Sequence, residues 1–242
     1  MTSPRTSAPT SQPSAPAAEG QDVSGKAAPI TSEHPGINEL FALLAYGEVA
    51  AFYRLTEEAR MAPNLLGRIN MASMAAAEMN HYELLRDALE HRGVDVVPAM
   101  TKYASALENY HRLTTPSTWL EALVKTYIGD AMAADFYLEI AGSMPPDAAG
   151  VVRSVLSETG HSQFVVAEVR AAVTASDRQR HRLALWSRRL LGEAITQAQY
   201  VLADHDELVD LVMSGGGLSQ MTDFFDRLQQ THSNRIEELG LG

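Results

Sequence analysis

The chain has 242 residues, of which 45% are hydrophobic, and it carries a formal net charge of −11 with no cysteine. This length suits one large domain or a domain with a tail, and the acidic balance disfavours nucleic acid and anionic membrane surfaces as general partners. The lack of cysteine excludes disulfides, thiolate metal sites and cysteine nucleophiles. Any bound metal must therefore be held by His, Asp and Glu, which are ligands typical of iron or manganese.

The first 33 residues are rich in Ser, Thr, Pro, Ala and Gly, with almost no large apolar side chains. Such a segment cannot bury enough surface to offset the entropy of ordering, so we expect residues 1–33 to form a disordered tail. The tail lacks the hydrophobic segment of a secretory signal, and no apolar run in the chain approaches the roughly 20 residues that span a bilayer. The protein is therefore predicted to be cytoplasmic, with no membrane contact.

Beyond the tail, apolar residues recur with the period of an α-helix, and strand patterns are almost absent. Gly93 is expected to end the second helix, a less regular crossover follows over residues 94–116, and Ser117 is expected to cap the third helix. The predicted helices cover residues 37–59, 66–92, 118–143, 148–175, 177–213 and 219–239. The expected fold class is all-α, a four-helix bundle over residues 34–175 with two additional C-terminal helices that extend the same domain over residues 176–242.

Two copies of an E-x-x-H motif lie 80 residues apart, at Glu78–His81 and Glu158–His161. Residues three apart share one face of a helix, so each motif directs a carboxylate and an imidazole towards one point. An acidic residue that follows a glycine precedes each motif, Glu48 in the first half and Asp130 in the second. Two carboxylate helices and two E-x-x-H helices supply the ligands of a dinuclear metal centre in a four-helix bundle. The predicted ligands are Glu48, Glu78, His81, Asp130, Glu158 and His161.

Several alternatives remain open at this point. A further match, Glu108–His111, lies in the crossover without an upstream acidic partner, and we interpret it as accidental. Aligning the two halves on their Phe-Tyr pairs places Asp135 close to the position of Asp130, so Asp135 is the alternative ligand of the third helix. His205 and His232 are expected at the surface rather than as ligands. The competing interpretation of the whole set is a metal-free bundle whose buried polar groups satisfy one another.

With the pattern E…E-x-x-H…D/E…E-x-x-H, residues 37–175 resemble the ferritin-like di-iron carboxylate superfamily. The resemblance implies two iron ions, with manganese as the alternative metal, and makes Glu78 and Glu158 the bridging carboxylates. The acid of the third helix is more often Glu in this superfamily, so Asp130 departs from the pattern. Its shorter side chain is expected to open a coordination position or to lengthen one metal contact.

The overall layout, including the extra C-terminal helices, is similar to the tRNA hydroxylase-like branch of this superfamily. The founding members of that branch hydroxylate the isopentenyl chain of methylthio-isopentenyl-adenosine. An independent feature is a concentration of arginine near the start of the fifth helix, because arginine contacts to phosphate are typical of nucleic-acid binding. The alternative is a solvated helix face, or arginines that pair with the acidic bundle. The residues concerned are Arg178, Arg180, Arg182, Arg188 and Arg189.

The leading functional hypothesis is a di-iron hydroxylase or monooxygenase that uses O2 and an external electron donor, with a modified tRNA nucleoside as a candidate substrate. The alternative is a ferritin-like protein that oxidises and stores iron or removes peroxide, for which a large symmetric shell is expected. A third hypothesis is a scaffold of the same fold without metal. The sequence permits a homodimer but does not determine the oligomeric state.

Overall fold

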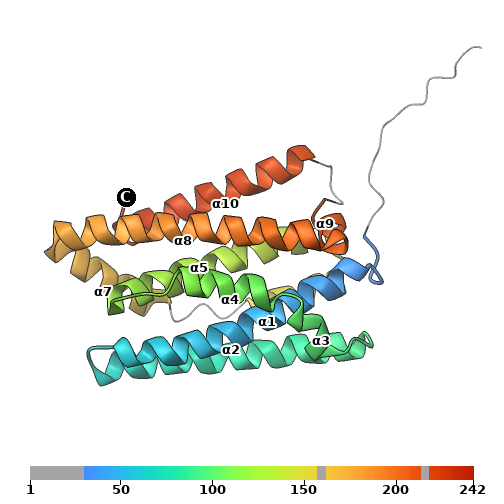
Figure 1. Ribbon diagram of the computed structural model, residues 1–242, viewed down its shortest axis with the longest axis horizontal. Helices are drawn as coiled ribbons and strands as arrows, with labels where there is room; N and C mark the ends of the chain where they lie inside the picture. Colours follow the sequence, from blue (N-terminus) through green and yellow to red (C-terminus); the bar gives the residue numbers. More distant parts are fainter. Residues whose placement is uncertain (1–29, 157–161, 214–217) are drawn as a thin grey trace, which may run out of the picture.

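The computed structural model describes residues 30–156, 162–213 and 218–242, and within these ranges all regular structure is helical. The prediction of an all-α ferritin-like fold is confirmed. In chain order the elements are α1 (Pro35–Glu58), the short 3-10 helix η1 (Ala59–Met61), α2 (Leu65–His91), α3 (Val96–Thr101), α4 (Ala104–Leu113), α5 (Trp119–Ala141), α6 (Pro146–Val155), α7 (Ser162–Ala175), α8 (Asp177–Asp204), α9 (Asp206–Met213) and α10 (Leu218–Glu238). Figure 1 shows the long helices running side by side along the molecule.

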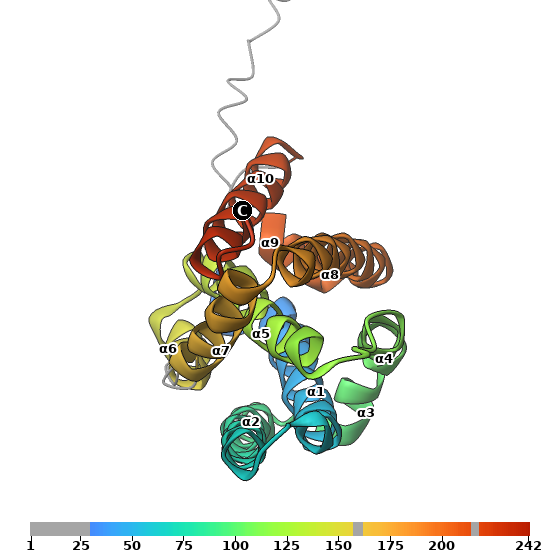
Figure 2. The same ribbon diagram turned by 90° about the vertical axis from the view of Figure 1, so that its left-hand side faces the viewer.

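The long helices are arranged around α5, which lies near the middle of the end view in Figure 2. On one side of α5, α1 packs against α2, and together these two helices form the first half of the bundle. On the other side α8 and α10 both pack against α5, and α7 lies beside it. The short helices α3 and α4 flank α1, while α6 contacts both α2 and α5.

The helix ends follow local sequence signals. The side chain of Asn64 caps α2 by accepting a hydrogen bond of 2.8 Å from the Gly67 amide, and Gly93 after its end has φ of +73° as a left-handed terminating residue requires. The cap of α5 is Thr118, whose hydroxyl accepts from the Glu121 amide, and not Ser117 as predicted. Ser117 instead donates its amide and hydroxyl to the Glu121 carboxylate at 2.7 and 2.6 Å, the reciprocal half of a capping box displaced by one residue.

Two apolar clusters make up the core, and they occupy opposite ends of the bundle. The first includes Leu44 of α1, Leu85 and Leu89 of α2, and Ile140 of α5. The second includes Leu55 of α1, Met71 and Ala75 of α2, Ile128 of α5 and Val165 of α7. On α1, α2 and α5 alike, a stretch of residues between the two clusters carries polar side chains. We call five of these the polar belt: Glu48, Arg54, Glu78, His81 and Asp130.

Several helices differ from the predicted ones. The crossover over residues 94–116 contains α3 and α4, and the expected fourth helix is described as two helices, α6 and α7. The C-terminal extension has three helices rather than two, because α8 ends where His205 adopts extended backbone angles (φ −137°, ψ 86°). Residues 1–29, which make up most of the predicted tail, lie outside the described part of the chain.

The expectation that His205 and His232 lie at the surface is wrong. His232 retains 2% of its surface exposure, on the face of α10 that packs inward. His205 is partly buried and its ring stacks on Tyr103, with 4.5 Å between the ring centroids.

In the described ranges, none of the helices combines the length and the apolar composition that crossing a bilayer would require.

Candidate metal centre

Three of the six predicted ligands converge in the polar belt. Glu48 comes from the middle of α1, and Glu78 and His81 lie one turn apart on the facing side of α2. The His81 Nδ1 atom is 3.4 Å from a carboxylate oxygen of Glu48 and 3.6 Å from one of Glu78. One donor atom from each residue lies within 4.8 Å of the other two, so the three groups surround a common point.

These separations suit metal ligands better than hydrogen-bond partners. A good hydrogen bond between nitrogen and oxygen spans about 2.7–3.2 Å, and both contacts of His81 Nδ1 are longer than that. Two ligand bonds of about 2.1 Å that meet at a metal at 90–120° separate their donor atoms by about 3.0–3.6 Å. The donor set of two carboxylates and one imidazole also matches the preference of iron and manganese. The residues present therefore fit a divalent cation.

The pKa values of Glu48, Glu78 and His81 are shifted by burial and by interactions among the three side chains. Burial, followed by the neighbouring Glu78, raises the pKa of Glu48 well above its ordinary value. Burial also acts to raise the pKa of Glu78, but interactions with Glu48 and His81 outweigh it and lower that pKa. The carboxylates of Glu48 and Glu78 raise the pKa of His81 to about 10. A cation that binds here must displace the proton on His81, and the raised pKa of Glu48 makes protons stronger competitors for that carboxylate, because metal ligands bind in their deprotonated forms.

The buried guanidinium of Arg54 completes the belt. One of its nitrogens donates hydrogen bonds to Glu58 at 3.0 Å and to Thr126 at 2.9 Å, and another lies 3.5 Å from the Asp130 carboxylate. Burial and the negative charge of Glu78 raise the pKa of Asp130 above its ordinary value. Asp130 is therefore close enough to the cluster to interact with it electrostatically. The sequence analysis did not identify Arg54. The signal that was available is its spacing of four residues from Glu58, which places an arginine and a glutamate on the same face of a helix.

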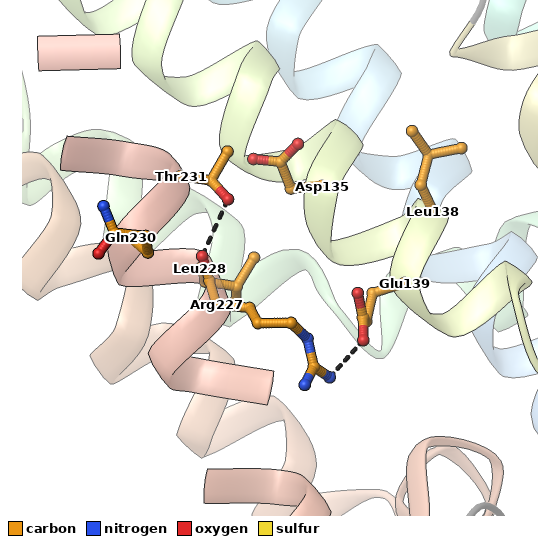
Figure 3. A pocket seen from close by; sticks show the side chains of 7 residues that line it. All are labelled: Asp135, Leu138, Glu139, Arg227, Leu228, Gln230 and Thr231. Atoms are coloured by element: carbon orange, nitrogen blue, oxygen red, sulfur yellow. Dashed lines mark hydrogen bonds and ion pairs between the residues drawn. The ribbon is translucent and has the colours of Figure 1, made fainter. Parts of the chain in front are cut away.

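Asp135, the alternative ligand of the third helix, faces a different part of the molecule. Its carboxylate pairs with Arg235 of α10 through two contacts, one of them 2.8 Å long. Asp135 also lines a cavity of about 370 Å³ between α5 and α10, which Figure 3 shows together with Glu139 and Arg227. The ion pair between Arg227 and Glu139 crosses the same cavity (Figure 3). Asp130, and not Asp135, is thus the carboxylate of α5 that lies in the polar belt.

The two remaining predicted ligands, Glu158 and His161, lie outside the described residues. Of the described residues before and after them in the chain, Val155 is buried in the first apolar cluster and Val165 in the second. The Nε2 atom of His81 is buried and has no hydrogen-bond partner among the described residues. The imidazole at the candidate site therefore has unused hydrogen-bonding capacity.

The third E-x-x-H match, Glu108–His111, does not join the cluster. Glu108 accepts a hydrogen bond of 2.6 Å from the Tyr46 hydroxyl, at the edge of α4. Burial, and then the positive charges of Arg54 and Lys125, lower the pKa of His111 to about 2, so this imidazole is neutral. Both residues line a separate cavity between α1, α4 and the start of α5.

Of the five arginines near the start of α8, three bind other groups of the protein and two form no ion pair with the described residues. Arg180 pairs with Asp177 of its own helix at 2.7 Å, and Arg182 pairs with Glu121 of α5 at 2.9 Å. Arg189 donates to the Leu113 carbonyl at 2.5 Å. The two others, Arg178 and Arg188, are exposed and form no ion pair with the described part of the chain.

Comparison with known proteins bears on this arrangement of helices and ligands. A family model described as a ferritin-like domain of actinomycetes matches residues 33–215, which is most of the chain. No curated protein matches the sequence. The matched range contains α1 to α9 and all six predicted ligands. The chain therefore belongs to the ferritin-like domain family of actinomycetes.

Proposed function

We propose that the protein holds two iron ions in the polar belt and uses them to oxidise an organic substrate with O2, as a hydroxylase of the monooxygenase type. The observation that carries this proposal is the convergence of Glu48, Glu78 and His81, with Asp130 close by, between the two apolar clusters of the core. Glu158 and His161 would complete the ligand set. Iron would supply the redox chemistry that activates O2, and manganese is the alternative metal.

The residues of the belt would position the ions and control protons. His81 would give up a proton when the cation binds, which leaves two carboxylates and a neutral imidazole as ligands. Arg54 would hold the Asp130 carboxylate in place while keeping its own contacts to Glu58. The apolar clusters on both sides would limit the access of water to the site.

The overall reaction requires a second reductant. Insertion of one oxygen atom into a C–H bond converts it to C–OH, while the other oxygen atom of O2 leaves as water. This balance consumes two electrons and two protons in addition to the substrate and O2. The electrons would come from an external donor of the ferredoxin or flavoprotein class.

A different use of the same site is iron oxidation and storage or the removal of peroxide. The cavity between α1, α4 and α5 favours the hydroxylase, because it has about 390 Å³ of space and one of its lining residues, Arg54, contacts Asp130. A ferroxidase needs no such space for an organic molecule.

The two functions differ in how much iron the protein retains. After exposure to a large excess of Fe(II) in air and removal of free iron, a hydroxylase keeps about two irons per chain. A storage protein accumulates many more and elutes from size-exclusion chromatography as a large shell. Retention of many irons per chain, or a shell-sized assembly, would contradict the proposal.

The hypothesis that the substrate is a tRNA nucleoside stays a prediction. Its support is the pair of exposed arginines, Arg178 and Arg188, that have no ion-pair partner in the described ranges. Against it, three of the five arginines of this segment already have protein partners.

A further inference from the structure

The outward side of α2 is a largely apolar face that none of the described helices covers. Of the nine large hydrophobic side chains that are exposed in the described part of the chain, four belong to α2. Single apolar side chains are normal at a protein surface, but a concentration of them along one helix indicates an interaction surface. We call this surface the α2 face. Its apolar members are Leu65, Leu66, Ile69 and Leu84, with the small residues Ala72 and Ala76 between them.

The position of α2 in the fold explains why this face has no partner among the described helices. α2 lies at the edge of the helix arrangement, where it packs mainly against α1 and has smaller contacts with η1, α3 and α6 (Figures 1 and 2). The candidate ligands Glu78 and His81 are on the other side of the helix, because at about 100° per residue Leu65 and His81 point in nearly opposite directions. The α2 face is therefore separate from the polar belt.

The charged residues of α2 make this face complementary to a second copy of itself. Arg68 is exposed in the N-terminal half of the helix, whereas Glu83 and Glu90 are exposed in the C-terminal half. None of these three side chains forms an ion pair within the described ranges. Arg86 already pairs with Asp87, so it leaves the C-terminal half negative. An antiparallel pair of α2 helices therefore places the basic half of each against the acidic half of the other, whereas a parallel pair would bring like charges together.

One register of such a pair satisfies the charges and the apolar side chains together. The midpoint between Arg68 and Glu83 and the midpoint between Leu66 and Leu84 both fall at residues 75–76. Leu66 and Leu84 also lie on the same side of the helix, since the 18 residues that separate them make about five turns. With a twofold axis beside Ala76, Arg68 of one copy meets Glu83 of the other, and Leu66 meets Leu84. The small side chain of Ala76 at the crossing lets the two helix axes approach to about 8 Å.

We propose that the α2 face is a homodimer interface, in which the α2 helices of two copies of the chain pack antiparallel about a twofold axis beside Ala76. The interface is isologous, so each contact between the copies occurs twice. Ion pairs at a surface contribute little affinity, so the apolar side chains supply most of the binding and the two Arg68–Glu83 pairs fix the orientation and the register. Because the polar belt lies on the other side of α2, formation of the dimer does not depend on the proposed metal centre.

Sedimentation equilibrium of the full chain at micromolar concentration measures the dimer directly. We expect the parent protein to be a dimer and Ile69→Glu to weaken dimerisation at least tenfold, because it places a charge in the apolar half of each copy. The control Leu185→Glu changes a leucine of α8 that is exposed to a similar extent, and it should leave the dimer intact. Arg68→Glu should also weaken the dimer, because it brings two carboxylates together. The exchange Arg68→Glu/Glu83→Arg should restore it, because the charges are again complementary.

The register has a test of its own, because the chain has no cysteine and a single introduced thiol can pair only between copies. Under mild oxidation Ala76→Cys should form an intermolecular disulfide, since the two copies of residue 76 meet at the twofold axis. A disulfide requires Cα atoms about 4.4–6.8 Å apart. Leu65→Cys should stay reduced, because in this register the two copies of residue 65 are about 33 Å apart along the helix axis.

A monomeric parent protein, or a dimer that Ile69→Glu leaves intact, would overturn the proposal. So would failure of the charge exchange to restore the dimer, or a disulfide at residue 65 in place of residue 76. All of these substitutions are at exposed positions, so circular dichroism should show the helix content of the parent in each variant. Iron content separates this proposal from the metal centre: a dimer that takes up no iron would overturn the oxygenase function alone, and an iron-loaded monomer would overturn the interface alone.

Discussion

The guanidinium of Arg54 lies 3.5 Å from the carboxylate of Asp130, so a buried cation of α1 holds the acidic residue that α5 contributes to the polar belt. The same guanidinium donates to Glu58 and to Thr126. Arg54 thus connects the candidate metal centre to the cavity between α1, α4 and the start of α5.

Replacement of Arg54 by methionine should destabilise the protein and increase its response to metal. Loss of one partner of a buried ion pair typically costs about 3–5 kcal/mol, because the remaining charges stay buried. A divalent cation near Asp130 would offset part of this loss. Chemical denaturation with and without Mn(II) should therefore show a lower free energy of unfolding for Arg54→Met and a larger gain from Mn(II) than in the parent. A gain no larger than that of the parent, or an equal loss in Arg86→Met, whose arginine pairs at the surface, would contradict this account.

The two acidic residues of α5 should respond differently to removal of their charge. Asp130→Asn should lower the iron content of the protein after anaerobic Fe(II) loading, because it removes a candidate ligand. Asp135→Asn should leave the iron content unchanged and reduce stability instead, since it leaves Arg235 without its carboxylate partner. Elemental analysis and thermal denaturation of the two variants provide the comparison. Loss of iron in Asp135→Asn with retention in Asp130→Asn would reverse the assignment.

His232 should make the protein less stable in mild acid. Burial, and then the charge of Arg235, lower the pKa of His232 in the folded state to about 4, whereas a histidine in the unfolded chain titrates near 6.5. The unfolded state therefore binds the proton more readily between these pH values, and the free energy of unfolding should fall as the pH drops from 6.5 towards 4. His232→Phe should reduce this slope in urea denaturation series, while the exposed His181→Gln should not. An unchanged slope in His232→Phe would show that other groups cause it.

The tRNA hypothesis predicts a salt-dependent complex that involves Arg178 and Arg188. If each contacts one phosphate, the double variant Arg178→Ala/Arg188→Ala should reduce the dependence of affinity on salt by about one unit per contact. Arg180→Ala, which removes a guanidinium already paired with Asp177, should have a smaller effect. Filter binding with total tRNA measures both. Absence of any tRNA affinity in the parent protein would end this hypothesis.

Local patterns in the sequence predicted much of the fold and part of the site. The spacing of Glu78 and His81 depends only on the geometry of one helix, and Gly93 follows from the backbone conformation of a helix end. Both predictions agree with the structure. The predicted cap of α5, Ser117, is one residue before the observed cap, Thr118, because the two side chains are chemically similar. Both residues form hydrogen bonds with Glu121.

Some features that depend on contacts between helices far apart in the sequence were not predicted. Arg54 and Thr126 are 72 residues apart in sequence, and no local pattern shows that they are hydrogen bonded. Asp130 was preferred over Asp135 from the sequence, but the pairing of Asp135 with Arg235, 100 residues away on α10, was not predicted. The burial of His232 follows from the packing of α10, which its polar sequence did not reveal.

The most direct test of the account is the iron content of the protein, measured by elemental analysis after purification without a metal-affinity column and anaerobic loading with Fe(II). We expect about two irons per chain in the parent, as in a dinuclear carboxylate centre. The variant Glu78→Ala/His81→Ala should lose them, while the control Glu139→Gln, which changes a surface carboxylate paired with Arg227, should retain them. Absence of iron in the parent, or full retention of iron in the Glu78→Ala/His81→Ala variant, would contradict the proposed metal centre.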